Sequence, residues 1–230
     1  MKKAENNSYA AEYLAQIFKI MQENEEFIRN NAKAVYDEVI GLINDAIDEV
    51  IFAVEKPKRE RDYIERSMAF FIYHVLVPFS YAIYLDLLAG NVPACFMELR
   101  FMLESLAKCY MADLRYPEVQ FFQMRLELLE RERLSISRVM EKLGEELGVA
   151  NGFVALWGKL SQDWVHMKGF TDKLVGYVSE KSDMPPWALV IPMNYTEKDL
   201  DILEELRDRI SQFRNLLRTS MEKYRQEYDP

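Results

Sequence analysis

Arg100 and Glu104 stand one helical turn apart in a segment rich in apolar residues. Side chains four positions apart share a face of a helix, so the two can form an ion pair. In a cleft between helices, the guanidinium would instead hold an anionic group while the carboxylate fixes its orientation. His166 is the third catalytic candidate, because imidazole exchanges a proton near neutral pH. The plainer alternatives are a row of ion pairs for the first two and a polar helix end for His166.

His74 and Tyr81 are candidates for binding a small ligand. They flank Pro78 within the apolar run Ser67–Ala89. Pro78 has no N–H, which predicts a kink that leaves the carbonyl of His74 without its helical partner, and kinks can shape pockets. The alternative is a core histidine hydrogen-bonded to a tyrosine or to the freed carbonyl.

A basic stripe is predicted on the last helix. It consists of Arg207, Arg214, Arg218 and Arg225. A stripe of this kind can grip a phosphate backbone or an acidic partner. Carboxylates of the same helix, Glu204, Asp208 and Glu222, are close enough to neutralise it, so pairing within the chain is the alternative.

The composition excludes several classes of protein. Half of the 230 residues are hydrophobic, which predicts a filled interior rather than a disordered chain. A net charge of -9 disfavours DNA and anionic membranes, whose affinity for proteins comes largely from Lys and Arg. The cysteines, Cys95 and Cys109, lie about 21 Å apart along one predicted helix, beyond disulfide reach. We therefore expect reduced thiols and, with no secretory signal at the N-terminus, a cytoplasmic protein.

Apolar periodicity predicts an all-α protein. The expected helices cover residues 8–54, 67–89, 93–114, 118–147 and 153–168, with a last helix opening at Thr196. The run from Ser67 is apolar on every side, so we expect a multi-helix bundle of about six or seven helices around this central, kinked helix. It is long enough to cross a bilayer, but His74 and Pro78 fall within it and no second such run exists, which disfavours a membrane protein.

Residues 1–230 are expected to form a single domain with two special segments. Residues 8–54 form a long N-terminal helix that either wraps the core or acts as an arm towards another subunit. Residues 181–195 form a proline-rich, apolar loop that should fold back on the body, serve as a lid or be covered by a partner. The segment at residues 55–61 reads as a basic turn.

Sequence motifs for cofactor or metal binding are missing. The chain has no CxxC, HExxH, GxGxxG, GxSxG or phosphate-binding glycine loop, and no Glu-x-x-His pair of the type used by di-iron bundles. We therefore expect no cofactor and no metal.

Two segments resemble a group of uncharacterised prokaryotic all-helical proteins that are similar to the HEPN-like superfamily. They are ELRFMLESLAKCY (Glu98–Tyr110) and LWGKLSQDWVHMKG (Leu156–Gly169). By this resemblance the positions of interest are Arg100, Glu104, Ser161 and His166. Many HEPN-like proteins are dimeric, metal-independent ribonucleases in which an Arg closely precedes the catalytic His, but no Arg closely precedes His166 here. The resemblance thus favours an all-α, dimeric fold over RNA cleavage.

Three functional hypotheses follow. The first is a homo-oligomeric protein, a dimer in the simplest case, that binds a protein or RNA partner rather than catalysing a reaction. The second is a HEPN-like ribonuclease in which His166 acts as general acid or base and Arg100 steadies the phosphate. The third is a helical bundle with a small-ligand pocket at Pro78, around His74.

Overall fold

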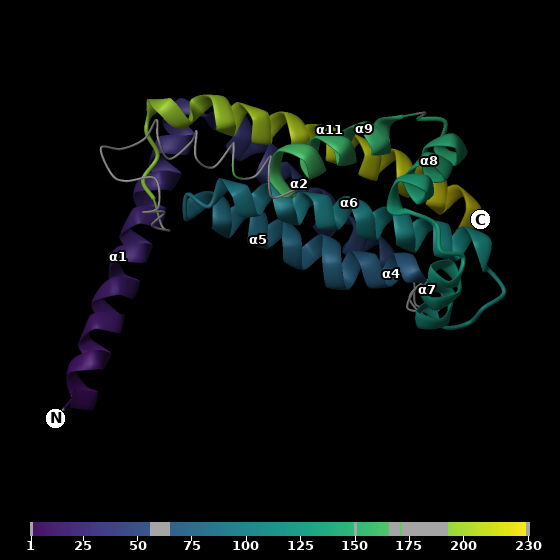
Figure 1. Ribbon diagram of the computed structural model, residues 1–230, viewed down its shortest axis with the longest axis horizontal. Coiled ribbons are helices and arrows are strands. Elements are labelled where there is room, and N and C mark those ends of the chain that lie inside the picture. The colour runs from purple at the N-terminus through teal and green to yellow at the C-terminus, as the bar shows by residue number, and fades with distance from the viewer. Residues whose placement is uncertain (1, 56–64, 150, 166–170, 172–192, 229–230) are drawn as a thin grey trace.

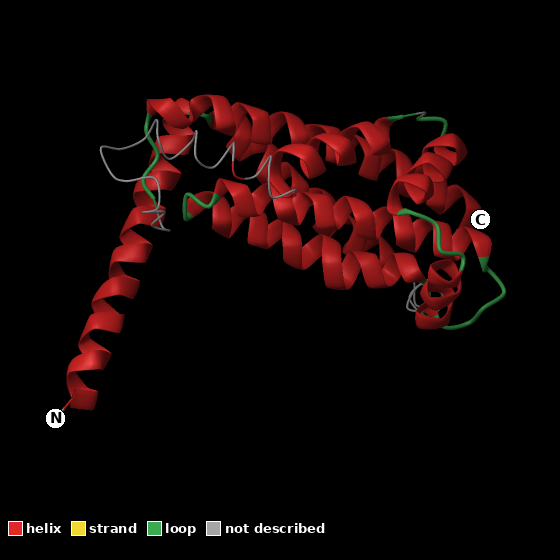
Figure 2. Ribbon diagram, in the orientation of Figure 1, coloured by secondary structure: helices red, strands yellow, loops and turns green. Residues whose placement is uncertain are grey.

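The computed structural model describes residues 2–55, 65–149, 151–165, 171 and 193–228, which form helices joined by turns, with no strand among them (Figure 2). The elements are α1 (Lys2–Asn31), α2 (Lys33–Val54), α4 (Ser67–Phe71), η1 (Ile72–Leu76), α5 (Val77–Leu88), α6 (Val92–Arg115), α7 (Phe122–Arg131), α8 (Ile136–Leu147), α9 (Gly152–Leu160), η2 (Ser161–Val165), η3 (Glu197–Asp199) and α11 (Leu200–Tyr228). The predicted all-α multi-helix bundle is confirmed. Residues 56–61 of the predicted basic turn and 181–192 of the proline-rich loop lie outside the described residues.

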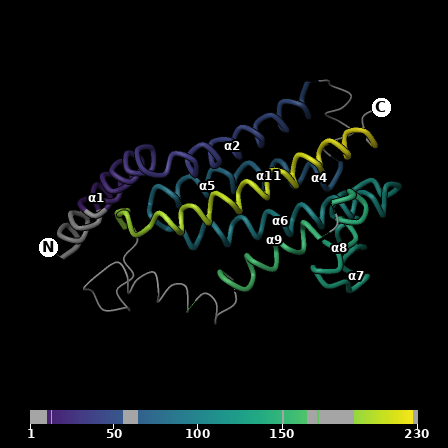
Figure 3. The backbone as a smooth tube through the Cα atoms, turned by 90° about the horizontal axis from the view of Figure 1, so that it is seen from above, coloured from purple at the N-terminus to yellow at the C-terminus, as the bar shows by residue number. Residues whose placement is uncertain are grey.

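The centre of the bundle is α6. It packs against α4, α5, α7, α8, α9 and α11, and its buried side chains point to several sides, among them Leu99, Leu103 and Tyr110. Figure 3 shows α6 running through the middle of the bundle, with α5 and α11 along it. The most enclosed helix is therefore α6, which follows the most apolar run of the sequence.

The apolar run itself, α4–η1–α5, packs mainly against α6 and α2, with α7 beside α4 and α1 beside α5. Its outer side leaves His74, Pro78, Tyr81 and Leu85 exposed, so our expectation of a helix buried on every side was wrong. By length and composition, Ser67–Leu88 is the one helix of the described residues that could cross a membrane, and 44% of its most apolar window is buried in the bundle. Packing against the neighbouring helices accounts for part of its apolar character.

The kink predicted at Pro78 takes the form of a π-helical turn. In η1 the chain is wound more loosely than in an α-helix, and the N–H of Val77 bonds the carbonyl of Ile72, five residues earlier. Pro78 then falls in the first turn of α5, where no helical N–H is required. The wider turn gives the proline ring room without ending the helix.

The predicted helix at residues 118–147 is divided in two. A turn separates α7 from α8, with Arg133 in the left-handed region at φ 54°. The hydroxyl of Ser135 then accepts a hydrogen bond from the N–H of Arg138 at 3.3 Å and caps α8. Serine is a favoured helix N-cap, which explains the restart at this position.

Asn24 fastens α1 to the body of the protein. Its amide donates to the carbonyls of Leu88 at 2.7 Å and Met193 at 2.8 Å, and its oxygen accepts from the N–H of Tyr195 at 2.8 Å. The side chain is 1% exposed, so these bonds form away from water. Gly90 completes this junction: its φ is +72°, and a Cβ there would lie 2.3 Å from the carbonyl oxygen of Met193. One asparagine thus joins α1, the end of α5 and the segment that leads into α11.

The part of α1 that precedes Asn24 projects from the end of the bundle, on the side where α5 lies (Figure 1). Leu14 and Phe18 in this part are 55% and 64% exposed. The predicted helical run at residues 8–54 is interrupted at Ala32, where ψ turns to 41°. After this break α2 lies along α11 and α5 and buries Val39, Leu42 and Ala46. The region thus combines a projecting helix with a core-covering one.

Asp113 of α6 anchors the start of the apolar run. Its carboxylate accepts from the backbone N–H groups of Ser67 at 2.8 Å and Met68 at 2.9 Å, at the N-terminus of α4. It also accepts from Arg125 of α7 at 2.7 Å and from the hydroxyl of Tyr224 of α11 at 2.8 Å. The carboxylate is fully buried, and four donors satisfy it, as a buried charge requires.

The two cysteines are buried, free thiols, as predicted. Burial raises the pKa of both Cys95 and Cys109 above the ordinary value for a thiol. Since the thiolate is the reactive form, both are inert core residues.

Candidate functional site

Four large apolar side chains form one exposed surface on neighbouring helices. Tyr81 and Leu85 of α5 are 44% and 54% exposed, and Met97 and Phe101 of α6 are 40% and 46% exposed. The tight turn at residues 89–91 makes α5 and α6 antiparallel neighbours (Figures 1 and 3). We call this surface, formed by Tyr81, Leu85, Met97 and Phe101, the apolar face.

The two halves of the apolar face lie on helices that touch each other through Phe79 of α5 and Phe101 of α6. The rings of Phe79 on α5 and Phe101 on α6 lie 4.8 Å apart, so the outer sides of the helices meet along this line. At 100° per residue, Met97, Phe101 and Lys108 fall on one arc of α6, while Pro78, Tyr81 and Leu85 fall on one arc of α5. Exposed apolar residues are usually scattered singly, whereas a contiguous patch marks a binding surface.

A pair of carboxyl groups lies along the line where the helices meet. Asp86 of α5 faces Glu98 of α6, and the amide of Asn91 donates to Asp86 at 2.8 Å. Glu98 Oε2 is buried and has no hydrogen-bond partner among the described residues. Burial, and then the neighbouring Asp86 carboxylate, raise the pKa of Glu98 to about 8. Glu98 therefore keeps its proton at neutral pH, and the apolar face has one negative charge at its centre instead of two.

Arg100 and Glu104 lie at the α9 edge of this surface. Arg100 Nε is 2.9 Å from Glu104 Oε1, which also accepts from the indole N–H of Trp157 at 2.7 Å. The guanidinium carbon lies 5.7 Å from the centre of the Trp157 ring. The guanidinium is thus held by a carboxylate and an aromatic ring of its own chain. This supports the ion-pair interpretation over an anion-binding one.

The third catalytic candidate, His166, lies outside the described residues, so its catalytic role stays a prediction. Ser161, implicated by resemblance, is buried at the start of the π-helical turn η2, and its hydroxyl has no partner among the described residues. Nearby, the rings of Trp164 and Phe96 stack with their centres 4.3 Å apart. The described part of this segment is a packed region of the core.

His74 and Tyr81 do not point into the interior. Both are exposed, because they lie on the outer side of the apolar run, and the ring of His74 lies 5.3 Å from that of Phe70. The prediction that His74 lines an internal pocket is therefore wrong. Tyr81 belongs to the apolar face. A hollow of about 260 Å³ lies elsewhere, between the α1–α2 junction and the first turn of α11, lined in part by Ala32, Val35 and Leu203.

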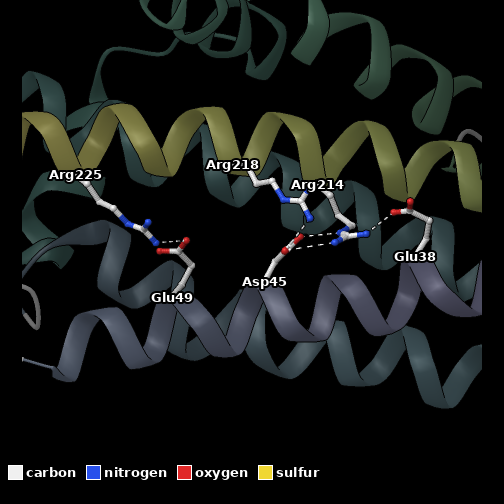
Figure 4. Close-up of polar contacts among 6 residues, drawn as sticks. All are labelled: Glu38, Asp45, Glu49, Arg214, Arg218 and Arg225. Atoms are coloured by element: carbon white, nitrogen blue, oxygen red, sulfur yellow. Dashed lines mark hydrogen bonds and ion pairs between the residues drawn. The ribbon is translucent and has the colours of Figure 1, made fainter.

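The predicted basic stripe is paired with carboxylates, mostly those of α2 (Figure 4). Arg214 contacts Glu38 at 2.6 Å and Asp45 at 2.7 Å, and Arg218 contacts Asp45 at 3.0 Å. Further along the two helices, Arg225 contacts Glu49 at 2.6 Å. Arg207 pairs on its own helix with Glu204 and Asp208, both at 2.6 Å. These pairs favour the intramolecular interpretation over binding of a phosphate backbone.

Sequence reasoning missed both the apolar face and the α2 carboxylates. Leu85, Met97 and Phe101 have the types and spacing of core residues, and only their position in the bundle exposes them. Glu38, Asp45 and Glu49 could have been found, since their seven- and four-residue spacing matches that of the arginines on α11. Within the described residues, no group of three or more His, Cys, Asp or Glu side chains is placed to hold a metal ion.

No protein-family model, curated protein or solved structure matches the chain. The function must therefore be argued from the geometry of the described residues.

Proposed function

We propose that the protein is a helical interaction protein that binds through the apolar face and forms a homo-oligomer, a dimer in the simplest case. The observation that carries this proposal is the exposure of four large apolar side chains on the neighbouring helices α5 and α6. Fully burying a large apolar side chain contributes about 1.5–3 kcal/mol, and covering these four, each already about half buried, contributes about half of that per side chain. In a symmetric dimer two such faces are covered, so the burial of both favours association.

The chemistry of the surroundings favours a protein partner. The carboxylate of Asp86 lies within the apolar face, on the line where α5 and α6 meet, and the net charge of the chain is -9. Both features repel nucleic acid and anionic lipid. A second copy carries the same net charge, but it also presents the same apolar surface, which a nucleic acid does not. We also propose that the protein acts in the reducing cytoplasm, and its two buried, free thiols are consistent with this location.

The test uses Leu85→Glu with Ile51→Glu as its matched control. Leu85 and Ile51 are 54% and 56% exposed. Ile51 lies on α2, where it forms a second exposed apolar line with Ile47 and Val54. Light scattering over a concentration series should give a dimer for the wild type and for Ile51→Glu, and a monomer for Leu85→Glu.

Other outcomes of this test would contradict the proposal. A wild type that is monomeric at high concentration excludes self-association, and loss of the dimer only in Ile51→Glu moves the interface to α2. Flotation of the protein with anionic vesicles, abolished by Leu85→Glu, would identify the face as a membrane-binding surface.

The HEPN-like ribonuclease is a weaker candidate, because it rests on the resemblance alone and the partners of Arg100 lie within the chain. It predicts cleavage of single-stranded RNA in the presence of a chelator, abolished by His166→Ala. Cleavage that survives the substitution, or no cleavage at all, removes this hypothesis.

A further inference from the structure

The projecting part of α1 is apolar on one side and is left uncovered by its own chain. Leu14 and Phe18 are four residues apart and therefore share a helix face, and both are more than half exposed. A helix of this length gains most of its stability from packing of such a face. We call the part of α1 before Asn24 the arm. Near the body of the protein, Met21 packs against the core and Glu23 accepts a hydrogen bond from Asn194 at 2.7 Å, so the exposed apolar face of the arm is the part that carries Leu14 and Phe18.

The arm cannot reach the apolar face of its own chain. α1 is one continuous helix from Lys2 to Asn31, and the three hydrogen bonds of Asn24 fix its direction. To fold back, the helix would have to break before Asn24, and the arm contains no proline or glycine that would favour a break. A second copy is the partner that can present a face to the arm.

The arm and the apolar run match in length and in position. At about 1.5 Å per residue, the arm and the helix Ser67–Leu88 are each about 33 Å long. The arm extends from the bundle on the side of α5 that is opposite its packing against α6 (Figure 1). Two copies related by a twofold axis can therefore each lay an arm along the exposed side of the other.

We propose that the arm of one copy packs on the apolar face of a second copy, with Leu14 and Phe18 covering Leu85 and Phe101, and that the exchange is reciprocal. This inference rests on the proposed function and names the occupant of the same face. A twofold axis makes the two contacts identical, so one substitution in the chain affects both. The protonated Glu98 at the centre of the face can be covered without placing a second charge beside Asp86.

The first experiment compares Phe18→Glu with the wild type by light scattering and analytical ultracentrifugation. The side chain of Phe18 is exposed, so the variant should fold, which far-ultraviolet circular dichroism checks. We expect the dimer dissociation constant to rise by about 100-fold or more, because two apolar contacts are lost per dimer. Lys19→Glu is the control: it changes the charge of the neighbouring exposed residue and should leave the constant within about threefold of the wild type.

The second experiment identifies which surfaces meet. Tagged chains with Phe18→Cys are mixed with untagged chains with Leu85→Cys, equilibrated and treated with a short bifunctional maleimide. The native thiols are buried and should not react. We expect at least about tenfold more tagged–untagged product than in a parallel mixture of Phe18→Cys with Ile51→Cys, because the two thiols share a high effective concentration at the interface.

The outcomes separate this inference from the proposed function. A dimer that is lost in Leu85→Glu but kept in Phe18→Glu retains the apolar face as the interface and excludes the arm. Crosslinking of Phe18→Cys chains only to one another shows arm–arm pairing and also overturns the inference. A protein that is monomeric under all conditions overturns the proposed function, and the inference with it.

Discussion

The guanidinium of Arg214 occupies the space beside Gly41, where a Cβ atom would lie 2.3 Å from Nη1. Arg214 reaches from α11 across to α2, where Glu38 and Asp45 hold it on both sides (Figure 4). A glycine inside a helix is less stable than alanine by about 1 kcal/mol. Its presence in α2 is explained by the room that it leaves for this arginine.

The substitution Gly41→Ala should therefore destabilise the wild type but stabilise the Arg214→Ala variant. In the wild type, the new methyl group displaces the guanidinium from two carboxylates, and we expect a net loss of about 1–2 kcal/mol in the free energy of unfolding. In Arg214→Ala the space is empty, and the same change should add about 0.5–1 kcal/mol. Urea unfolding of the four proteins gives the coupling energy. An effect of the same sign in both backgrounds would show that the close approach does not matter.

Asn24→Ala should loosen the attachment of α1. The substitution leaves two buried carbonyls and one N–H without partners, and we expect a loss of about 2–4 kcal/mol. Amide hydrogen exchange should accelerate in α1 and at residues 193–195. Asn31→Ala is the control, because the exposed Asn31 bonds only the carbonyl of Phe27 within α1. Equal effects of the two substitutions would refute the role of Asn24 as the junction.

Asp113→Asn should be among the most damaging single changes. It removes the charge that compensates the buried Arg125 and weakens the anchoring of α4, which together should cost about 3–5 kcal/mol. Glu127→Gln disrupts an exposed pair with Arg131 at 3.7 Å and should cost less than about 0.5 kcal/mol. Thermal and urea unfolding measure both. A cost for Asp113→Asn as small as that of the control would mean that the network contributes little.

Glu98→Gln should change how stability depends on pH. The pKa of Glu98 is about 8 in the folded protein, against an ordinary value of 4.5, so the folded state holds a proton that the unfolded state releases. The contribution of Glu98 is therefore fully present below about pH 4.5 and is lost as the pH rises to about 8. The Glu98→Gln variant stays neutral, so its stability relative to that of the wild type should increase as the pH rises from about 4.5 to about 8.

For this partly buried group we expect a difference of only about 1 kcal/mol at pH 8, or about 2–4 °C in melting temperature. Melting temperatures at a series of pH values from 4.5 to 9 make the comparison, with Glu127→Gln as the exposed control. A constant difference between Glu98→Gln and the wild type across this range would show that Glu98 is ionised throughout.

Local signals predicted much of the fold. The turn at Gly90 follows from a glycine that can take a positive φ, and the start of the last helix follows from the capping box between Thr196 and Asp199. The interruption between α1 and α2 falls at Ala32, directly after Asn30 and Asn31. These features depend on neighbouring residues, so the sequence pattern contains them.

The candidate site depends on contacts between distant segments, which periodicity does not report. Leu85 and Phe101 resemble core residues, and their exposure follows from α6 occupying the centre of the bundle instead of α5. The division of α7 from α8 was missed because the apolar pattern continues through the turn. The carboxylates of Asp86 and Glu98 could not be paired before the register of α5 against α6 was known.

The π-helical turn η1 also decides which side chains the second half of the apolar run shows to the outside. A π turn holds one more residue than an α turn, so every side chain after it is rotated by about 100° relative to an uninterrupted helix. Tyr81 and Leu85 owe their outward position to that additional residue. Loss of a single amino acid between Ile72 and Leu76 would turn a different set of side chains to the surface, and a one-residue deletion is thus a route by which related chains could change their binding partners.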